Sequence, residues 1–209
     1  MFIDPPKSNF EQAPSGTHLA ILVKLIDLGW QDNTFNGETK EQHQAMLTWE
    51  LPLKLNSKGR PFLISKTLNL SLHEKATFRS WAENMMGRVF VEADLDGANR
   101  FNAKELLGKS CMIKVDHEQK NGKTYSKIAN LIQTPEGIPE PHQVNECVYF
   151  TLEPGEFDEE VFESLSSWTK EKIQGSEGFS NLRATQRKEP KPSEPEKTVA
   201  EFIDDEIPF

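Results

Sequence analysis

The chain has 209 residues, enough for one domain of ordinary size with appendages or for two very small domains. Its hydrophobic fraction of 36% is low for a fully globular protein, so part of it is expected to lie outside any core. No apolar run approaches the roughly 20 residues that cross a bilayer. Residues 1–6 lack the basic-then-apolar pattern of a secretory signal. We therefore expect a cytoplasmic protein with no membrane partner.

The formal net charge of −9 divides unevenly along the chain. Residues 1–134 carry 17 Lys and Arg against 15 Asp and Glu, a net charge of +2. Residues 135–209 carry 7 against 18, a net charge of −11. A near-neutral body can still present a local basic groove, whereas a separate acidic arm serves another purpose. The average hides two parts of opposite electrostatic character.

The first expected elements are an arm, a long strand and a loop. Residues 1–16 contain three prolines and predict an N-terminal arm. Residues 17–29 are rich in Leu, Ile and Val and predict a strand. Residues 30–43 are polar and include an Asn-Gly pair, so they predict a loop that exposes Trp30 and Phe35.

Two strands with period-two patterns follow. In residues 44–55, four leucines and Trp49 alternate with mostly polar neighbours, and residues 56–61 predict a basic turn. Residues 62–72 predict a third strand with one apolar and one polar face. The apolar face carries Phe62, Ile64, Leu68 and Leu70, and the polar face carries Ser65, Thr67, Asn69 and Ser71. Such a strand buries one side and exposes the other to water.

A helix is expected after the third strand. Residues 73–86 carry apolar side chains at helical spacing. Ser71 and Glu74 have the spacing of a capping box at its start, and Gly87 is expected to end it. Residues 88–109 are less regular and predict a short strand and then a helical turn.

A hairpin completes the body. Residues 110–117 and 123–132 predict strands around Asn121-Gly122, which is the strongest short hairpin signal. The order strand, strand, strand, helix, strand, strand is the connectivity of an OB-fold, a five-stranded barrel with a helix between strands three and four. The sequence therefore predicts a mainly β fold with helices, built on an OB-fold barrel over residues 17–134.

The rest of the chain predicts an extension and a tail. Residues 135–175 begin with a proline-containing linker, and residues 144–152 predict a short strand. Residues 157–173 predict a helix with acids first and lysines last, an order that suits the helix dipole. Its apolar stripe consists of Phe157, Val161, Leu165 and Trp168, and is expected to dock on the barrel. Residues 176–209 are polar and then rich in Pro and Glu, so we expect a disordered acidic tail.

The end of the sequence carries its most specific pattern. It consists of Asp204, Asp205, Glu206, Ile207, Pro208 and Phe209. Three acidic residues precede three apolar ones. Such a segment suits a partner whose small hydrophobic pocket takes the Phe209 ring and whose surrounding Lys or Arg residues pair with the acids. These six residues resemble the tip of bacterial and phage single-stranded DNA-binding proteins, except that Glu206 replaces an Asp. The resemblance implies that the tip recruits replication or recombination proteins such as a polymerase, primase, helicase or nuclease.

Short segments of the body carry a second resemblance. They are residues 15–18 (SGTH), 26–29 (IDLG), 49–52 (WELP), 71–75 (SLHEK) and 107–109 (LGK), with a weaker continuation at 168–173 (WTKEKI). Over about residues 14–135 they resemble a group of bacteriophage OB-fold proteins. The resemblance implies phage origin and a role in phage DNA replication or recombination. It does not identify the residues that contact DNA.

Candidate DNA contacts follow from what binding a single strand requires. Phosphates need a cationic track, and bases need aromatic faces, each stack being worth about 1–3 kcal/mol. In an OB-fold the track crosses strands two and three and runs between the first and fourth loops. The candidate cations are Lys54, Lys58, Arg60 and Lys66 around the second turn, and Lys120, Lys123 and Lys127 around the hairpin. The candidate stacking residues are Trp30, Phe35, Phe62 and Tyr125, whereas Trp49, Trp81 and Trp168 are expected in the core.

No enzymatic chemistry is predicted. The sequence has no Walker loop, nucleophile elbow or paired-carboxylate motif, and its five histidines have no zinc-ligand spacing. Cys111 and Cys147 lie in no metal or redox motif and are expected to be reduced structural thiols. We therefore expect no cofactor and no metal.

The combined expectation is a sequence-independent single-stranded DNA-binding protein, active in phage DNA replication, recombination or repair. Its acidic tail is expected to compete for the basic groove until DNA displaces it. Two alternatives remain at this stage: an adaptor that mimics the tail of the host's single-stranded DNA-binding protein, and a nuclease or deaminase acting on single strands. The sequence leaves monomer and homodimer open.

Overall fold

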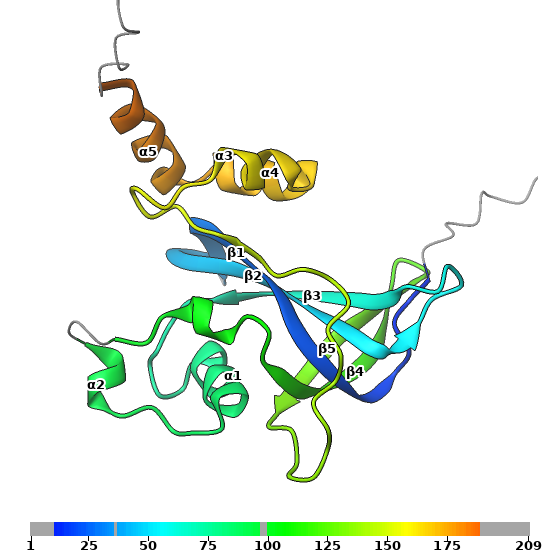
Figure 1. Cartoon of the computed structure of the whole chain (residues 1–209). Coiled ribbons are helices and arrows are strands. Elements are labelled where there is room, and N and C mark those ends of the chain that lie inside the picture. The colour runs from blue at the N-terminus through cyan, green and yellow to red at the C-terminus, as the bar shows by residue number, and fades with distance from the viewer. Residues whose placement is uncertain (1–10, 36, 97–99, 189–209) are drawn as a thin grey trace, which may run out of the picture.

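The computed structural model describes residues 11–35, 37–96 and 100–188, and shows a mainly β protein (Figure 1). The strands are β1 (Gly16–Phe35), β2 (Glu38–Leu55), β3 (Pro61–Asn69), β4 (Ser110–Lys120), β5 (Lys123–Ile132) and β6 (Val148–Phe150). The helices are α1 (Thr77–Met86), α2 (Glu92–Leu95), α3 (Glu159–Ser164), α4 (Ser167–Gln174) and α5 (Glu177–Lys188), with a 3-10 turn η1 (Ala103–Leu106). Among these described helices, none combines the length and the apolar composition needed to span a bilayer. The prediction of a mainly β fold with helices is confirmed.

All six strands belong to one sheet. Its order is β3-β2-β1-β4-β5, with antiparallel neighbours, and β6 adds to β1 in parallel. β1 is shared, because residues 16–21 pair with β4 and residues 21–35 pair with β2. The predicted hairpin at Asn121-Gly122 is confirmed: both residues have positive φ, 51° and 71°, as a two-residue turn of this kind requires.

The sheet is not closed into a barrel by hydrogen bonds. Within the described residues no backbone ladder joins β3 to β5. A side chain crosses between them instead, because Lys66 Nζ donates to the backbone oxygen of Ile128 at 2.9 Å. The same Nζ lies 4.9 Å from the ring centroid of Trp81 in α1. The closed five-stranded barrel expected from the element order is therefore not confirmed, and β3 and β5 face each other across a seam.

The main core lies between one face of the sheet and α1. Trp49 of β2 is fully buried and meets Trp81 edge to face, with ring centroids 5.7 Å apart. The buried face of α1 consists of Phe78, Trp81, Ala82 and Met85, the predicted helical stripe. Trp49 and Trp81 are thus confirmed as core residues. The other two tryptophans, Trp30 and Trp168, lie outside this core and are about half exposed.

Helix α1 begins later than the sequence predicts. Its first residue is Thr77 rather than residue 73, and its N-cap, Ala76, offers no side-chain hydrogen bond. Ser71 instead accepts a hydrogen bond from the backbone of His73 at 3.3 Å, so the expected capping box is wrong. The predicted end is confirmed, since Gly87 adopts the left-handed conformation with φ of 66°.

A second core covers the opposite face of β1. It consists of Ile26, Leu28, Phe150, Leu152, Phe162 and Ile173. The predicted helix over residues 157–173 docks here but is split in two, because the side chains of Asp158 and Ser166 cap α3 and α4 separately. Trp168 is 52% exposed, so its assignment to the core is wrong.

The extension continues further than predicted. Helix α5 covers part of the stretch that the sequence assigned to a disordered tail, and Leu182 on it is buried. Phe179 of the same helix stacks on Phe162 with centroids 5.3 Å apart. The folded extension therefore reaches residue 188, and the rest of the predicted tail lies outside the described residues.

A buried carboxylate fastens the extension to the sheet. Glu50 of β2 is fully buried on the face opposite the main core. It accepts hydrogen bonds from the backbone nitrogens of Val144 (2.8 Å) and Asn145 (2.9 Å), and from the Asn145 amide (2.7 Å). We call residues 143–147 the strap. Three donors around one buried carboxylate satisfy a group that would otherwise be costly to bury.

The predicted loop over residues 30–43 is instead a two-stranded ribbon. β1 continues to Phe35 and β2 starts at Glu38, with register Trp30 to His43 and onward. Polar pairs stabilise it across the strands: Asn33 bonds Gln42 at 3.0 Å, and Thr34 bonds Thr39 at 2.9 Å. The expected loop is therefore wrong, because cross-strand polar pairs replace the apolar alternation that marks a strand in sequence.

Replacing Glu50 tests the strap. We expect Glu50→Gln to lower the free energy of unfolding by about 2 kcal/mol, because hydrogen bonds to a charged acceptor are lost and an amide hydrogen then faces the donors. Urea denaturation measures the change. Glu41→Gln, an exposed position on the same strand, is the matched control and should change stability little. Equal stability of the two variants would show that the strap contributes nothing.

Candidate nucleic-acid interface

Two basic turns lie side by side at one end of the sheet. They are the β2–β3 turn, residues 56–60, and the β4–β5 hairpin, both on the right of Figure 1. Glu11 accepts a hydrogen bond from the backbone of Ser57 at 2.9 Å, and Gln12 accepts one from the backbone of Ser126 at 2.7 Å. Because Glu11 and Gln12 are consecutive, the two turns must be neighbours.

The next residue of this N-terminal segment completes the link. The backbone oxygen of Ala13 accepts hydrogen bonds from His117 Nε2 and from Ser126 Oγ, both at 2.8 Å. Ala13 itself is buried in the main core. The segment over residues 11–14 is thus a fixed part of the folded body, whereas the predicted arm covered residues 1–16 as a whole.

The predicted cations of the two turns are brought together and mostly unpaired. Those without an ion pair among the described residues are Lys54, Lys58, Arg60, Lys120 and Lys123, and all five are exposed. Lys127 pairs with Glu118 across the hairpin at 2.9 Å. Unpaired exposed ammonium and guanidinium groups at neighbouring turns form a surface that attracts phosphate. Glu11 and Glu118 lie beside it, and contacts with Ser57 and with Lys127 lower their respective pKa values.

Lys66 differs from the other predicted cations. It lies on the inner face of β3 with the apolar side chains, and it is half-buried. Burial lowers the pKa of its ammonium group, and the neighbouring Lys127 lowers it further. Its hydrogen bond to Ile128 and its contact with Trp81 use the ammonium group within the seam. Lys66 therefore lies between β3 and β5, and not on the outer surface of the sheet with the other predicted cations.

Of the predicted stacking residues, Tyr125 lies best for the basic turns. It is 47% exposed on β5, and Lys123 and Lys127 flank it on the same face of the strand. Phe62 is half-buried and packs against the main core. Phe35 ends β1, and its side chain is outside the part of the chain that the structure describes.

Trp30 lies far from the two turns. It is 51% exposed on the β1–β2 ribbon and stacks on His43, with ring centroids 5.5 Å apart and planes inclined by 19°. His43 and the end of β2 are separated by 12 residues, roughly 40 Å along an extended strand. The structure therefore does not bring Trp30 and Tyr125 together, and one strand would have to span the sheet to reach both.

A groove with no carboxylate in its lining lies at the end of β3. We call it the β3 groove; it has a volume of about 530 Å³ and is lined by Thr67, Leu68, Asn69, Ser71, His73, Lys75, Ala76 and Thr77. Its hydroxyl, amide, imidazole and ammonium groups can all donate hydrogen bonds to phosphate. With Ser65 it extends the exposed polar face of β3 away from the basic turns.

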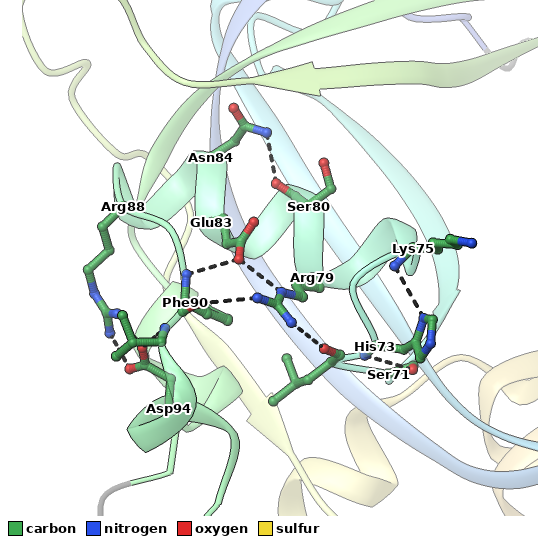
Figure 2. Close-up of polar contacts among 12 residues, drawn as sticks. Ser71, His73, Lys75, Arg79, Ser80, Glu83, Asn84, Arg88, Phe90 and Asp94 are labelled. Carbon is green, nitrogen blue, oxygen red and sulfur yellow. Dashed lines mark hydrogen bonds and ion pairs between the residues drawn. The ribbon is translucent and has the colours of Figure 1, made fainter.

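Hydrogen bonds hold α1, next to the groove, to the segments before and after it. Figure 2 shows Arg79 donating to Glu83 at 2.9 Å and to the backbone oxygens of Leu72 (3.1 Å) and Phe90 (3.2 Å). The same view shows His73 Nδ1 accepting from the backbone of Lys75 at 3.2 Å. That bond requires an unprotonated Nδ1, so Nε2 carries the proton and is left as a donor.

His73 and Lys75 were missed as candidate binding residues in the sequence. The expected helix over residues 73–86 places them in its first turn, as ordinary surface residues. The polar alternation of Ser65, Thr67 and Asn69 was visible in the sequence as the wet face of the third strand. The sequence carries no signal for the true start of α1 at Thr77, because no side chain caps this helix.

Several predicted features lie outside the described residues or add no site. The tip residues 204–209 fall outside them. In the described ranges, no three His, Cys, Asp or Glu side chains are grouped so that they could hold a metal ion. Cys111 is buried, which raises the pKa of its thiol, and Cys147 is exposed; neither forms a disulfide. A scan against models of known protein families finds no match for this chain, and a search of curated proteins finds none either.

Proposed function

We propose that this protein binds single-stranded DNA without sequence preference, through a variant OB-type sheet with an open β3–β5 seam. The observation that supports the proposal best is the meeting of two basic turns beside exposed Tyr125, with an acid-free polar groove further along β3. We further propose that the protein acts in phage DNA replication, recombination or repair, in the cytoplasm of the host.

The path of the strand follows from these features. Phosphates would contact the unpaired cations of the two turns and then the hydroxyl and amide groups of β3, ending at His73 and Lys75. Tyr125 would stack on a base near the start of this path, and Trp30 would serve only a strand long enough to reach the ribbon. The bases of duplex DNA are stacked on one another and cannot stack on Tyr125. A duplex would therefore make the phosphate contacts without the base stacking, and would bind more weakly than a single strand.

The acidic tail would recruit partners in this proposal. Residues 189–209 contain seven acids and two lysines, and the tip ends in Phe209. Tethering to the body gives such a segment a high effective concentration near the basic turns, where it would compete with DNA. Bound DNA would displace it and release Phe209 for a partner with an apolar pocket ringed by cations.

Salt dependence of binding tests the cationic surface. A Lys58→Gln, Lys123→Gln double variant should show a log affinity–log salt slope shallower by about 1.4 than the parent protein, since each lost phosphate contact on a single strand removes about 0.7. Fluorescence anisotropy with labelled oligothymidylate measures the slope. Lys109→Gln, Lys172→Gln removes the same charge elsewhere and should leave it unchanged. No binding of oligothymidylate by the parent protein in dilute buffer would refute the proposed function and would favour an adaptor.

Tyr125 tests the stacking contribution. Tyr125→Ala should weaken oligothymidylate binding by about 5- to 150-fold, the equivalent of one lost base stack, with little effect on the salt slope. Tyr125→Phe keeps the ring and is the matched control, so it should bind almost as the parent does. If Ala and Phe variants bind equally, the aromatic face of Tyr125 does not contact a base.

Removal of residues 189–209 tests the tail. The truncated protein should bind oligothymidylate more tightly than the full chain at low salt, and the difference should shrink as salt screens the charges. It should also lose its recruitment of replication or recombination proteins in a pull-down, as should Phe209→Ala in the full chain. Unchanged DNA affinity at low salt would contradict competition by the tail, while retained recruitment would contradict the role of the tip.

A further inference from the structure

We propose that a pocket beneath Trp30 binds a single nucleotide, with the base inside and the phosphate at Arg100. The choice of a nucleotide as ligand rests on the proposed function, whereas the pocket itself does not. It lies on the main-core side of the β1–β2 ribbon, away from the basic turns, and is distinct from the β3 groove. We call it the ribbon pocket.

The ribbon pocket has the size of a small-molecule site. Its volume is about 490 Å³, within the range of roughly 300–1,000 Å³ that ligand pockets usually show. It is bounded by the ribbon, β6, the start of α1 and the segment around η1. Its lining combines apolar side chains (Leu25, Ala45, Leu70, Leu72, Phe78, Leu95, Phe101, Ala103, Phe150) with polar ones (Asp27, His43, Arg100, Asn102, Tyr149, Thr151, Glu153).

The end of β3 separates the two cavities. Asn69 and Ser71 line the β3 groove, whereas Leu70 and Leu72, which alternate with them, line the ribbon pocket. A strand whose phosphates follow the groove would therefore pass the wall of the ribbon pocket. Phe101, only 9% exposed, adds an aromatic surface to that pocket, which suits the flat face of a base.

Some polar groups of the pocket are held by hydrogen bonds within the protein, which we call braced, and others have none and could bind a ligand. Asp27 is braced, because Oδ1 accepts from Gly29 N and bonds His43 Nε2, both at 2.8 Å, and Oδ2 accepts from Leu152 N at 3.2 Å. The Glu153 carboxylate and the Asn102 side-chain amide nitrogen have no hydrogen-bond partner among the described residues. Glu153 and Asn102 are exposed, so this acceptor and this donor lie toward the open side of the pocket, and together they match the edge of a base, which carries both kinds of group.

Charge selects where a phosphate can sit. Asp27 and Glu153 make the interior unfavourable for an anion. Among the residues that line the pocket, Arg100 is exposed, is permanently cationic and forms no ion pair with the described residues, so it can hold a phosphate at the rim. An uncharged base inside with its phosphate outside satisfies both constraints, and a wholly anionic ligand does not.

Trp30 connects the pocket to a longer strand. One face of its ring lies on His43, whose own ring lines the pocket, and half of Trp30 remains exposed. His43 Nε2 donates a hydrogen bond to Asp27, which holds the His43 ring in place beneath Trp30 and raises the pKa of the imidazole. A second base next to the one in the pocket could thus stack on Trp30.

The test uses 2′-deoxyadenosine 5′-monophosphate and 2′-deoxyadenosine, titrated separately into the full chain and followed by Trp fluorescence and calorimetry. Ala103→Trp places a ring in the pocket and should weaken binding of both ligands at least tenfold. Ala184→Trp adds the same ring on the exposed side of α5 and is the matched control, with binding unchanged. Arg100→Gln, an exposed change with little effect on folding, should weaken the nucleotide about tenfold and leave the nucleoside unaffected; Lys109→Gln should affect neither.

Two results would overturn the proposal. One is a parent chain that binds neither ligand, and the other is equal nucleotide affinity in the Ala103→Trp and Ala184→Trp proteins. Neither result touches the proposed function, which depends on oligothymidylate and the basic turns. A third result separates the two proposals. If the parent chain does not bind oligothymidylate but binds the nucleotide, and Ala103→Trp abolishes that nucleotide binding, the pocket would be supported and single-strand binding refuted.

Discussion

Two hydrophobic cores share one strand, and the rest of the molecule depends on this sharing. Leu22 and Leu25 of β1 enter the main core beneath α1, whereas Ile26 and Leu28 enter the second core beneath the C-terminal helices. Irregular register between Leu22 and Lys24 lets successive parts of the strand meet different neighbours. β1 must therefore be long and apolar on both faces, as a strand buried on both sides is.

Because β1 serves two cores, only some surfaces of the sheet remain free for polar side chains that could bind a ligand. The second core covers one face of β1, the strap covers Glu50 of the neighbouring β2, and α1 with the main core covers part of the other face of β1. What stays open is the polar face of β3, the two turns at one end and the ribbon with its pocket at the other. The basic groups lie in the body and the acidic excess in the extension and tail, which agrees with the uneven charge of the sequence.

Local patterns predicted the elements well, and contacts between distant segments account for the errors. The strands, the hairpin and the buried face of α1 were evident from periodicity and turn residues. The ribbon was missed because polar pairs such as Asn33–Gln42 stabilise it, and these are visible only once the register is known. The position of Lys66 was available in principle, since it shares period two with Ile64 and Leu68 on the apolar face. Trp168 fits a single long helix, and the cap at Ser166 breaks that helix and turns the ring outward.

The carboxylate under the strap also bears on how the chain is made. Glu50 lies 94 residues before Val144, its first donor in the strap. At ribosomal speeds of about 5–20 residues per second, roughly 5–20 s pass between the synthesis of Glu50 and that of Val144. During that interval the nascent sheet keeps a charged group that still needs water. Synthesis order thus makes closure of this face a late event, after the β1–β2 pairing that positions the carboxylate.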